Sequence, residues 1–144
     1  MSGSESERAP EALGAYPHAK RAGNLLFLSG IGPRRRGSKE IPGVELDAQG
    51  NVVSYDIAAQ CLSCFANVRA VLEDAGSSWA NIVDVTVFLT DLRRDFAAYN
   101  ALYAEHFAGE GKPNPTRTTV EVARLPQGGN APIAIELKVV ATIG

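Results

Sequence analysis

The stretch Ile82-Val83-Asp84-Val85-Thr86-Val87-Phe88-Leu89-Thr90 predicts a half-buried β-strand near the middle of the 144-residue chain. It is rich in β-branched residues, and apolar residues at 83, 85, 87 and 89 alternate with polar residues at 84, 86 and 90. Successive side chains of a strand point to opposite faces of the sheet, so we expect one face of this strand to be buried.

Helical patterns flank this strand on both sides. Before it, Asp56 is a good N-cap, and apolar residues recur at helical spacing until Gly76, which is typical of a residue just past a helix end. After it, Asp95 is predicted to cap a second helix. The apolar stripe of that second helix consists of Phe96, Tyr99, Leu102, Tyr103 and Phe107.

Further strands are predicted on either side of this unit. Residues 18–28 favour a hairpin, residues 32–50 a long loop rich in Gly, Pro and charge, and residues 51–53 a short third strand. Residues 116–123 and 133–141 alternate as two final strands. The order β-β-(β)-α-β-α-β-β predicts an α+β two-layer domain, with a mixed sheet and both helices on one of its faces.

Net charge and composition indicate which partners and which location to expect for this protein. The formal net charge of −2 gives no general attraction to nucleic acid or to an anionic membrane. Residues 1–13 are polar and acidic without the pattern of a signal peptide, so we expect a flexible tail followed by a single domain over residues 14–144. No apolar run is long enough to span a bilayer, and a cytoplasmic location is expected.

The two cysteines, Cys61 and Cys64, form a Cys-x-x-Cys pair. Such a pair is either a redox centre, half of a metal site, or two small residues on the buried face of a helix. The third interpretation is favoured, because no second cysteine pair exists and the pair lies well inside a predicted helix.

Two charged residues stand in the middle of the last two strands. Alternation predicts that Arg117 and Glu136 lie opposite the apolar rows of those strands. Such charges either face solvent on an open sheet surface or line a pocket, and periodicity alone leaves both alternatives open.

Several motifs, in order, resemble the RidA/YjgF family. They are Gly14-Ala15-Tyr16-Pro17-His18 through Leu28-Ser29-Gly30, Phe88-Leu89-Thr90-Asp91-Leu92, Asn100-Ala101-Leu102-Tyr103, Pro115-Thr116-Arg117-Thr118-Thr119-Val120-Glu121-Val122 and Ile135-Glu136. The resemblance implies a chorismate-mutase-like fold, a homotrimer with active sites in clefts between subunits, and no metal or organic cofactor.

The resemblance also implies roles for individual residues. Arg117 matches the arginine that binds the substrate carboxylate, and Glu136 matches the acid that holds a water molecule. Tyr16, Ser29 and Gly30 match residues that line the cleft. A guanidinium suits a carboxylate because it donates two parallel hydrogen bonds and fixes the plane of the substrate. Glu136 would orient or deprotonate the attacking water.

Some residues depart from the common family pattern. His18 stands near the expected cleft where many members have glutamine, and it is either a substrate contact or a structural hydrogen-bonder. The run Arg34-Arg35-Arg36 resembles the 2-aminomuconate deaminase branch, whose dicarboxylate substrate would need a second cation. One of these three arginines would supply it, with Arg35 named as the candidate substrate contact, and a solvated basic loop is the alternative.

The resemblance implies a hydrolytic deaminase. The first choice is conversion of 2-aminomuconate to 4-oxalocrotonate (2-oxohex-3-enedioate) and ammonia, in aromatic or tryptophan catabolism. An alternative is a broad 2-iminobutanoate/2-iminopropanoate deaminase. A non-enzymatic alternative is a trimer that binds a small carboxylate or a protein partner.

Overall fold

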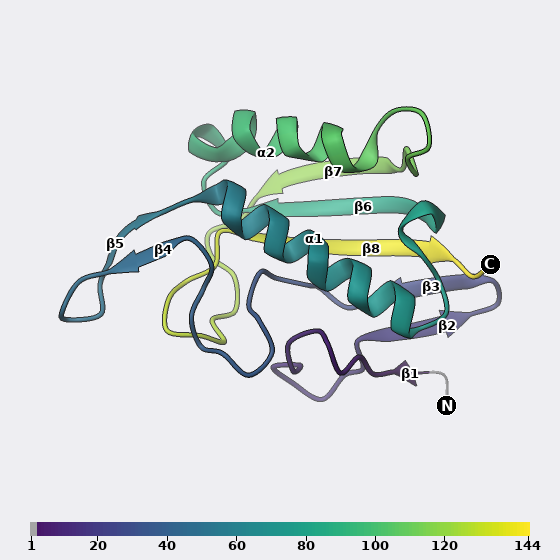
Figure 1. The fold of residues 1–144 in the computed structure, drawn as a ribbon, viewed down its shortest axis with the longest axis horizontal. Coiled ribbons are helices and arrows are strands. Elements are labelled where there is room, and N and C mark those ends of the chain that lie inside the picture. The colour runs from purple at the N-terminus through teal and green to yellow at the C-terminus, as the bar shows by residue number, and fades with distance from the viewer. Residues whose placement is uncertain (1–2) are drawn as a thin grey trace.

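The computed structural model describes residues 3–144, in which a six-stranded mixed sheet is covered on one face by two long helices (Figure 1). The strand order is β1-β2-β3-β8-β6-β7, and all neighbours are antiparallel except β6 and β7. The strands of this sheet are β1 Gly3–Ser4, β2 Ala19–Ala22, β3 Leu25–Leu28, β6 Ile82–Leu89, β7 Thr116–Glu121 and β8 Ile135–Thr142. The predicted α+β two-layer domain is confirmed.

The first helix, α1 (Ile57–Asp74), forms where the sequence predicted it. The Asp56 carboxylate accepts a hydrogen bond from the Ala58 amide, and Gly76 has the positive φ of 88° that L-residues disfavour. A short 3₁₀ helix, η1 (Trp79–Asn81), then leads into β6. These local signals explain why the boundaries could be predicted without knowledge of the fold.

The second helix, α2 (Leu92–Phe107), begins earlier than predicted. Its N-cap is Asp91, whose carboxylate accepts from the Arg94 amide, and the prediction that Asp95 caps it is wrong. Asp95 is instead 1% exposed inside the first turn, where it accepts a 2.6 Å hydrogen bond from the Tyr55 hydroxyl. Burial raises the pKa of Asp95, against the effect of the Tyr55 hydrogen bond.

Register places the side chains of β7 on faces opposite to those predicted. Val85 and Val87 of β6 are fully buried on the helix-covered side, and Val85 is paired with Arg117. Directly paired residues point to the same face, so Arg117 lies on the side of the helices. Phe88 is paired with Glu136, so Glu136 lies on the opposite, open face. Alternation could not reveal this, because β7 carries polar residues on both faces.

The expected long loop contains a strand that the sequence did not predict. Strand β4 (Val44–Leu46) pairs with β5 (Val52–Tyr55), the predicted third strand, in a separate two-stranded sheet. This hairpin projects beyond the end of the main sheet (Figure 1). Its pairing is irregular between Glu45 and Leu46. Strand β4 is only three residues long, too short for alternation to identify it in a loop rich in Gly and Pro.

The N-terminal residues, expected to be a flexible tail, lie against the body of the fold. Ala9 is fully buried in the main core, and the Arg8 guanidinium is 2.8 Å from the Asp74 carboxylate at the end of α1. Residues 1 and 2 lie outside the described residues. Within residues 3–144, no helix has the length and apolar character needed to cross a membrane.

Candidate functional site

A hollow of about 150 Å³ lies beside the end of β3 and the start of β8. Tyr16, His18, Gly30, Arg34 and Glu136 all contribute to its lining, together with residues 10–13. The structure therefore brings together Tyr16, His18, Gly30 and Glu136, four of the residues named as site candidates in the sequence. It adds Arg34, where Arg35 was expected.

Glu136 packs directly onto Gly30. A Cβ atom added to Gly30 would lie 2.9 Å from the Glu136 carboxyl carbon, so any larger residue would force this carboxyl to shift. The open-face position of Glu136 would expose it, but the loop after β3 and the N-terminal residues cover it. Burial raises the pKa of Glu136 above that of an ordinary glutamate, which makes its carboxylate a stronger proton acceptor.

The other predicted wall residues have local partners. Tyr16 is 44% exposed, and its hydroxyl oxygen accepts a 3.3 Å hydrogen bond from the Leu13 amide. The Ser29 hydroxyl donates to the Pro17 carbonyl at 2.7 Å, which ties the end of β3 to the segment before β2. Tyr16 thus faces the hollow, whereas Ser29 supports its wall.

His18 is buried, with both ring nitrogens bonded to the N-terminal backbone. Nδ1 lies 2.9 Å from the Ser6 amide nitrogen and 3.1 Å from the Glu5 carboxylate, and Nε2 lies 2.8 Å from the Pro10 carbonyl. The side chain is 4% exposed. This geometry favours a structural role for His18 over the expected substrate contact.

The three consecutive arginines lie in three different environments. Arg34 lines the Glu136 hollow, and its Nη2 donates to the Glu11 carbonyl at 2.6 Å. Arg35 instead lines a separate, larger hollow of about 820 Å³ between α1 and the β4–β5 hairpin. Arg36 binds the N-terminal backbone. The expected substrate contact, Arg35, is therefore on the wrong side of the loop to face Glu136.

Arg117 does not share this hollow within one chain. Its Nη1 donates to the Asn100 side-chain oxygen at 2.8 Å, and its guanidinium carbon lies 4.6 Å from the centre of the Tyr103 ring. Strand β6 stands between β7 and β8, and the two charged side chains lie on opposite faces of the sheet. A joint site for Arg117 and Glu136 therefore requires a second copy of the chain.

Sequence reasoning missed the support around Arg117. Asn100 and Tyr103 lie three residues apart on α2, so they share the helix face that meets β7. The Tyr99 hydroxyl forms a 2.8 Å hydrogen bond with the Thr119 hydroxyl beside them. The i, i+3 spacing of an amide and an aromatic ring was the available signal, but it does not identify the partner strand.

The described residues offer no metal-binding group of three or more His, Cys, Asp or Glu side chains. Cys61 and Cys64 are buried free thiols in the main core. Burial raises the pKa of Cys61 to about 12 and that of Cys64 well above its ordinary value, so neither thiol ionises readily. The geometry favours the interpretation of the pair as core residues.

Comparison with known proteins gives similarity over nearly the whole chain. Residues 6–143 match the family described as Endoribonuclease L-PSP. A RutC family protein from Pyrococcus abyssi is 37% identical over 137 residues, covering 94% of this chain and 92% of that protein. A 2-iminobutanoate/2-iminopropanoate deaminase from Escherichia coli K12 is 36% identical over 136 residues, covering 94% and 93%. The structure of Escherichia coli TdcF with bound serine has 32% identity and a TM-score of 0.76, with 100% of both chains covered.

Proposed function

Since this chain belongs to the RidA/YjgF family, we propose that it is a deaminase that hydrolyses the imine or enamine of an amino acid to a carbonyl compound and ammonia. The observation that carries the proposal is the desolvated Glu136 carboxyl, held on Gly30 in a hollow with Tyr16 and Arg34. A carboxyl in this setting can accept a proton from water and return it to a leaving amine.

The proposed reaction needs one water molecule. Water oxygen bonds to the imine carbon while the C=N π electrons move to nitrogen, and Glu136 takes a proton from the water. Transfer of that proton to nitrogen gives a carbinolamine, which carries one hydroxyl and one NH2 group. Glu136 then moves the hydroxyl proton to this nitrogen, so that the C–N bond breaks with NH3 as the leaving group and the carbonyl forms. No oxidant, reductant or metal is needed for this balance.

Arg117 would bind the substrate carboxylate from a neighbouring subunit of a homotrimer. Its position on the edge strand β7 and its contacts with Asn100 and Tyr103 support a fixed guanidinium there. The open sheet face also carries side chains suited to burial against another copy. These exposed apolar side chains include Leu25, Phe27 and Val120.

A mixing experiment tests this composite site. Arg117→Ala and Glu136→Gln should each keep only a small residual activity alone, with ammonia release as the assay. Unfolded together and refolded, they should regain about one quarter of wild-type activity, because a site then needs Arg117 from one variant and Glu136 from the other. A mixture that stays at the residual activity, with both variants folded and trimeric by light scattering, would contradict a site shared between subunits.

Two substrates remain candidates for the site. The Escherichia coli relative is named for 2-iminobutanoate and 2-iminopropanoate, and these short imino acids are our first choice. A second candidate is 2-aminomuconate, as expected from the arginine run, because Arg34 adds a cation to the hollow that holds Glu136. Its second carboxylate would accept charge-assisted hydrogen bonds from this guanidinium.

Freshly generated 2-iminopropanoate and 2-aminomuconate separate the candidates. If Arg34 binds a distal carboxylate, Arg34→Gln should raise the KM for 2-aminomuconate by about 10-fold or more and leave the KM for 2-iminopropanoate within about twofold. Arg35→Gln, from the other hollow, is the matched comparison and should change neither. Equal losses on both substrates would exclude the second-cation role, and no acceleration of either would overturn the deaminase proposal.

A further inference from the structure

Residues 6–13 lead to one wall of the Glu136 hollow, which residues 10–13 line, without any strand or helix of their own. We call this segment the N-terminal wall. Strand β1 ends at Ser4, β2 begins at Ala19, and residues 10–13 of the wall line the hollow. Because no backbone ladder holds the wall, its position depends on the side chains that bind its backbone.

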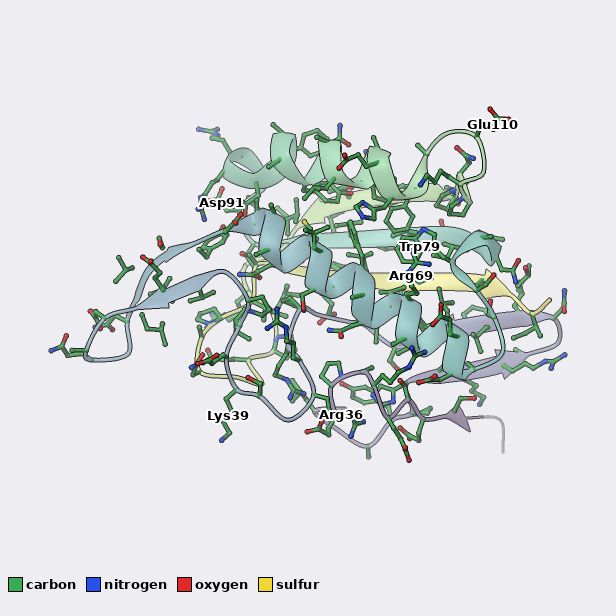
Figure 2. The ribbon with its side chains drawn as sticks, in the orientation of Figure 1. Arg36, Lys39, Arg69, Trp79, Asp91 and Glu110 are labelled. Carbon is green, nitrogen blue, oxygen red and sulfur yellow. The ribbon has the colours of Figure 1, made fainter. Side chains whose placement is uncertain are left out.

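Arg36 binds the N-terminal wall with all three guanidinium nitrogens. Nε donates to the Ala9 carbonyl and Nη2 to the Ser6 carbonyl, each at 2.7 Å. Nη1 lies 3.5 Å from the Glu11 carboxylate. Figure 2 shows Arg36 beside the N-terminal segment. A planar fork of donors fixes the relative positions of its acceptors, which a single point charge would not do.

The N-terminal wall in turn holds the polar groups that face Glu136. The Glu11 carbonyl accepts from Arg34, and the Leu13 amide donates to the Tyr16 hydroxyl. A shift of the wall would therefore move both of these side chains. Arg36 itself contacts neither of them and is not part of the lining of the hollow.

Side chains of α1 form hydrogen bonds with the backbone of the loop that carries these arginines. The Ser63 hydroxyl donates to the Pro33 carbonyl at 2.7 Å. The Asn67 amide donates to the carbonyls of Gly32 and Arg34 at 2.9 and 2.7 Å. Arg36 therefore extends from a loop that is hydrogen-bonded to α1. Its guanidinium in turn fixes the position of the N-terminal wall relative to α1.

We propose that Arg36 is a positioning residue for substrate binding, which acts by holding the N-terminal wall so that Arg34 and Tyr16 face Glu136. The kinetic part of this inference rests on the proposed deaminase function. Removal of Arg36 leaves other anchors in place, because His18 still binds Ser6 and Arg8 still pairs with Asp74. The variant chain is therefore expected to fold.

The test compares Arg36→Gln with Arg21→Gln, an exposed arginine that also donates to a backbone carbonyl but lies at the β2–β3 turn. In Arg36→Gln, amide hydrogen exchange within residues 6–13 should rise about 10-fold, while α1 and β8 keep their protection. Its KM for 2-iminopropanoate should rise about 10-fold with kcat within about twofold, because the displaced Tyr16 positions substrate in the ground state and the transition state alike. Arg21→Gln should match the wild type in every measurement.

The outcomes separate this inference from the deaminase proposal. Unchanged exchange in the wall, or an unchanged KM in an active enzyme, overturns the positioning role. A fall in kcat alone, with a lowered melting temperature, indicates loss of folded enzyme and also overturns it. Arg36→Lys keeps the charge without the fork, so a wild-type KM in that variant would refute positioning by bidentate contact. If the wild type releases no ammonia, the deaminase proposal fails, and the exchange data still decide whether Arg36 holds the wall.

Discussion

Substitution of Gly30 by alanine should damage the site without unfolding the protein. The added Cβ would lie 2.9 Å from the Glu136 carboxyl carbon, about 0.5 Å inside ordinary van der Waals contact, so the carboxyl must withdraw by at least this distance. A displacement of about 1 Å costs on the order of 100-fold in rate, so a fall in kcat/KM of about 10-fold to 100-fold is expected. Gly30 has no positive φ, and backbone strain adds nothing.

The assay is ammonia release from 2-iminopropanoate, with the melting temperature measured on the same samples. The control is Gly30→Ala in a Glu136→Ala background, where no carboxyl remains to be displaced. There the second substitution should change the residual rate by less than about twofold, because the two residues act through one contact. A Gly30→Ala enzyme with wild-type kcat/KM, or a loss of equal size in both backgrounds, would refute the steric reasoning.

Three further perturbations probe other contacts. Tyr55→Phe removes the hydroxyl that donates to buried Asp95 and should lower the free energy of unfolding by about 1–3 kcal/mol, measured in urea; no change would contradict the importance of this bond. Burial raises the pKa of Glu136, so the folded state binds this proton more tightly than the unfolded chain, and the free energy of unfolding should fall as pH rises from the ordinary glutamate pKa to the raised one. Glu136→Gln should remove that decline, and an unchanged pH profile would argue against it. Tyr103→Leu removes the ring beside the Arg117 guanidinium and should raise the KM about 10-fold, whereas Tyr103→Phe should restore it.

Elements with strong local signals were predicted well. The hairpin of β2 and β3 turns at Gly23, which has a φ of 61°, and α1 lies between Asp56 and Gly76. Alternation in β8 correctly predicted that Ile135, Leu137 and Val139 are buried. In each case the deciding interaction lies within a few residues, so the local sequence contains it.

Elements whose environment depends on distant residues were predicted less well. Asp95 has the residue type of a helix cap. In the fold it is buried instead, and the hydroxyl of Tyr55, forty residues away along the chain, donates a hydrogen bond to its carboxylate. The β4–β5 pairing was missed because β4 has only three residues, which gives too short a pattern for a strand to be recognised. The side of the sheet on which Arg117 lies depends on the register between β7 and β6. The sequence of β7 does not reveal this register, because the strand has polar residues on both faces.

For the candidate site, the resemblance to the RidA/YjgF family pointed to a carboxyl, a tyrosine and a guanidinium, and these groups suit imine hydrolysis, which needs a proton acceptor and a carboxylate-binding group. The folded arrangement selected Arg34 from three consecutive arginines, placed Glu136 against Gly30, and separated Arg117 from both within one chain. Local sequence carries chemical identity and backbone preference over a few residues. Proximity between residues far apart in the chain arises only when strand register and packing place them, and this is why the contacts of the site emerged from the tertiary structure alone.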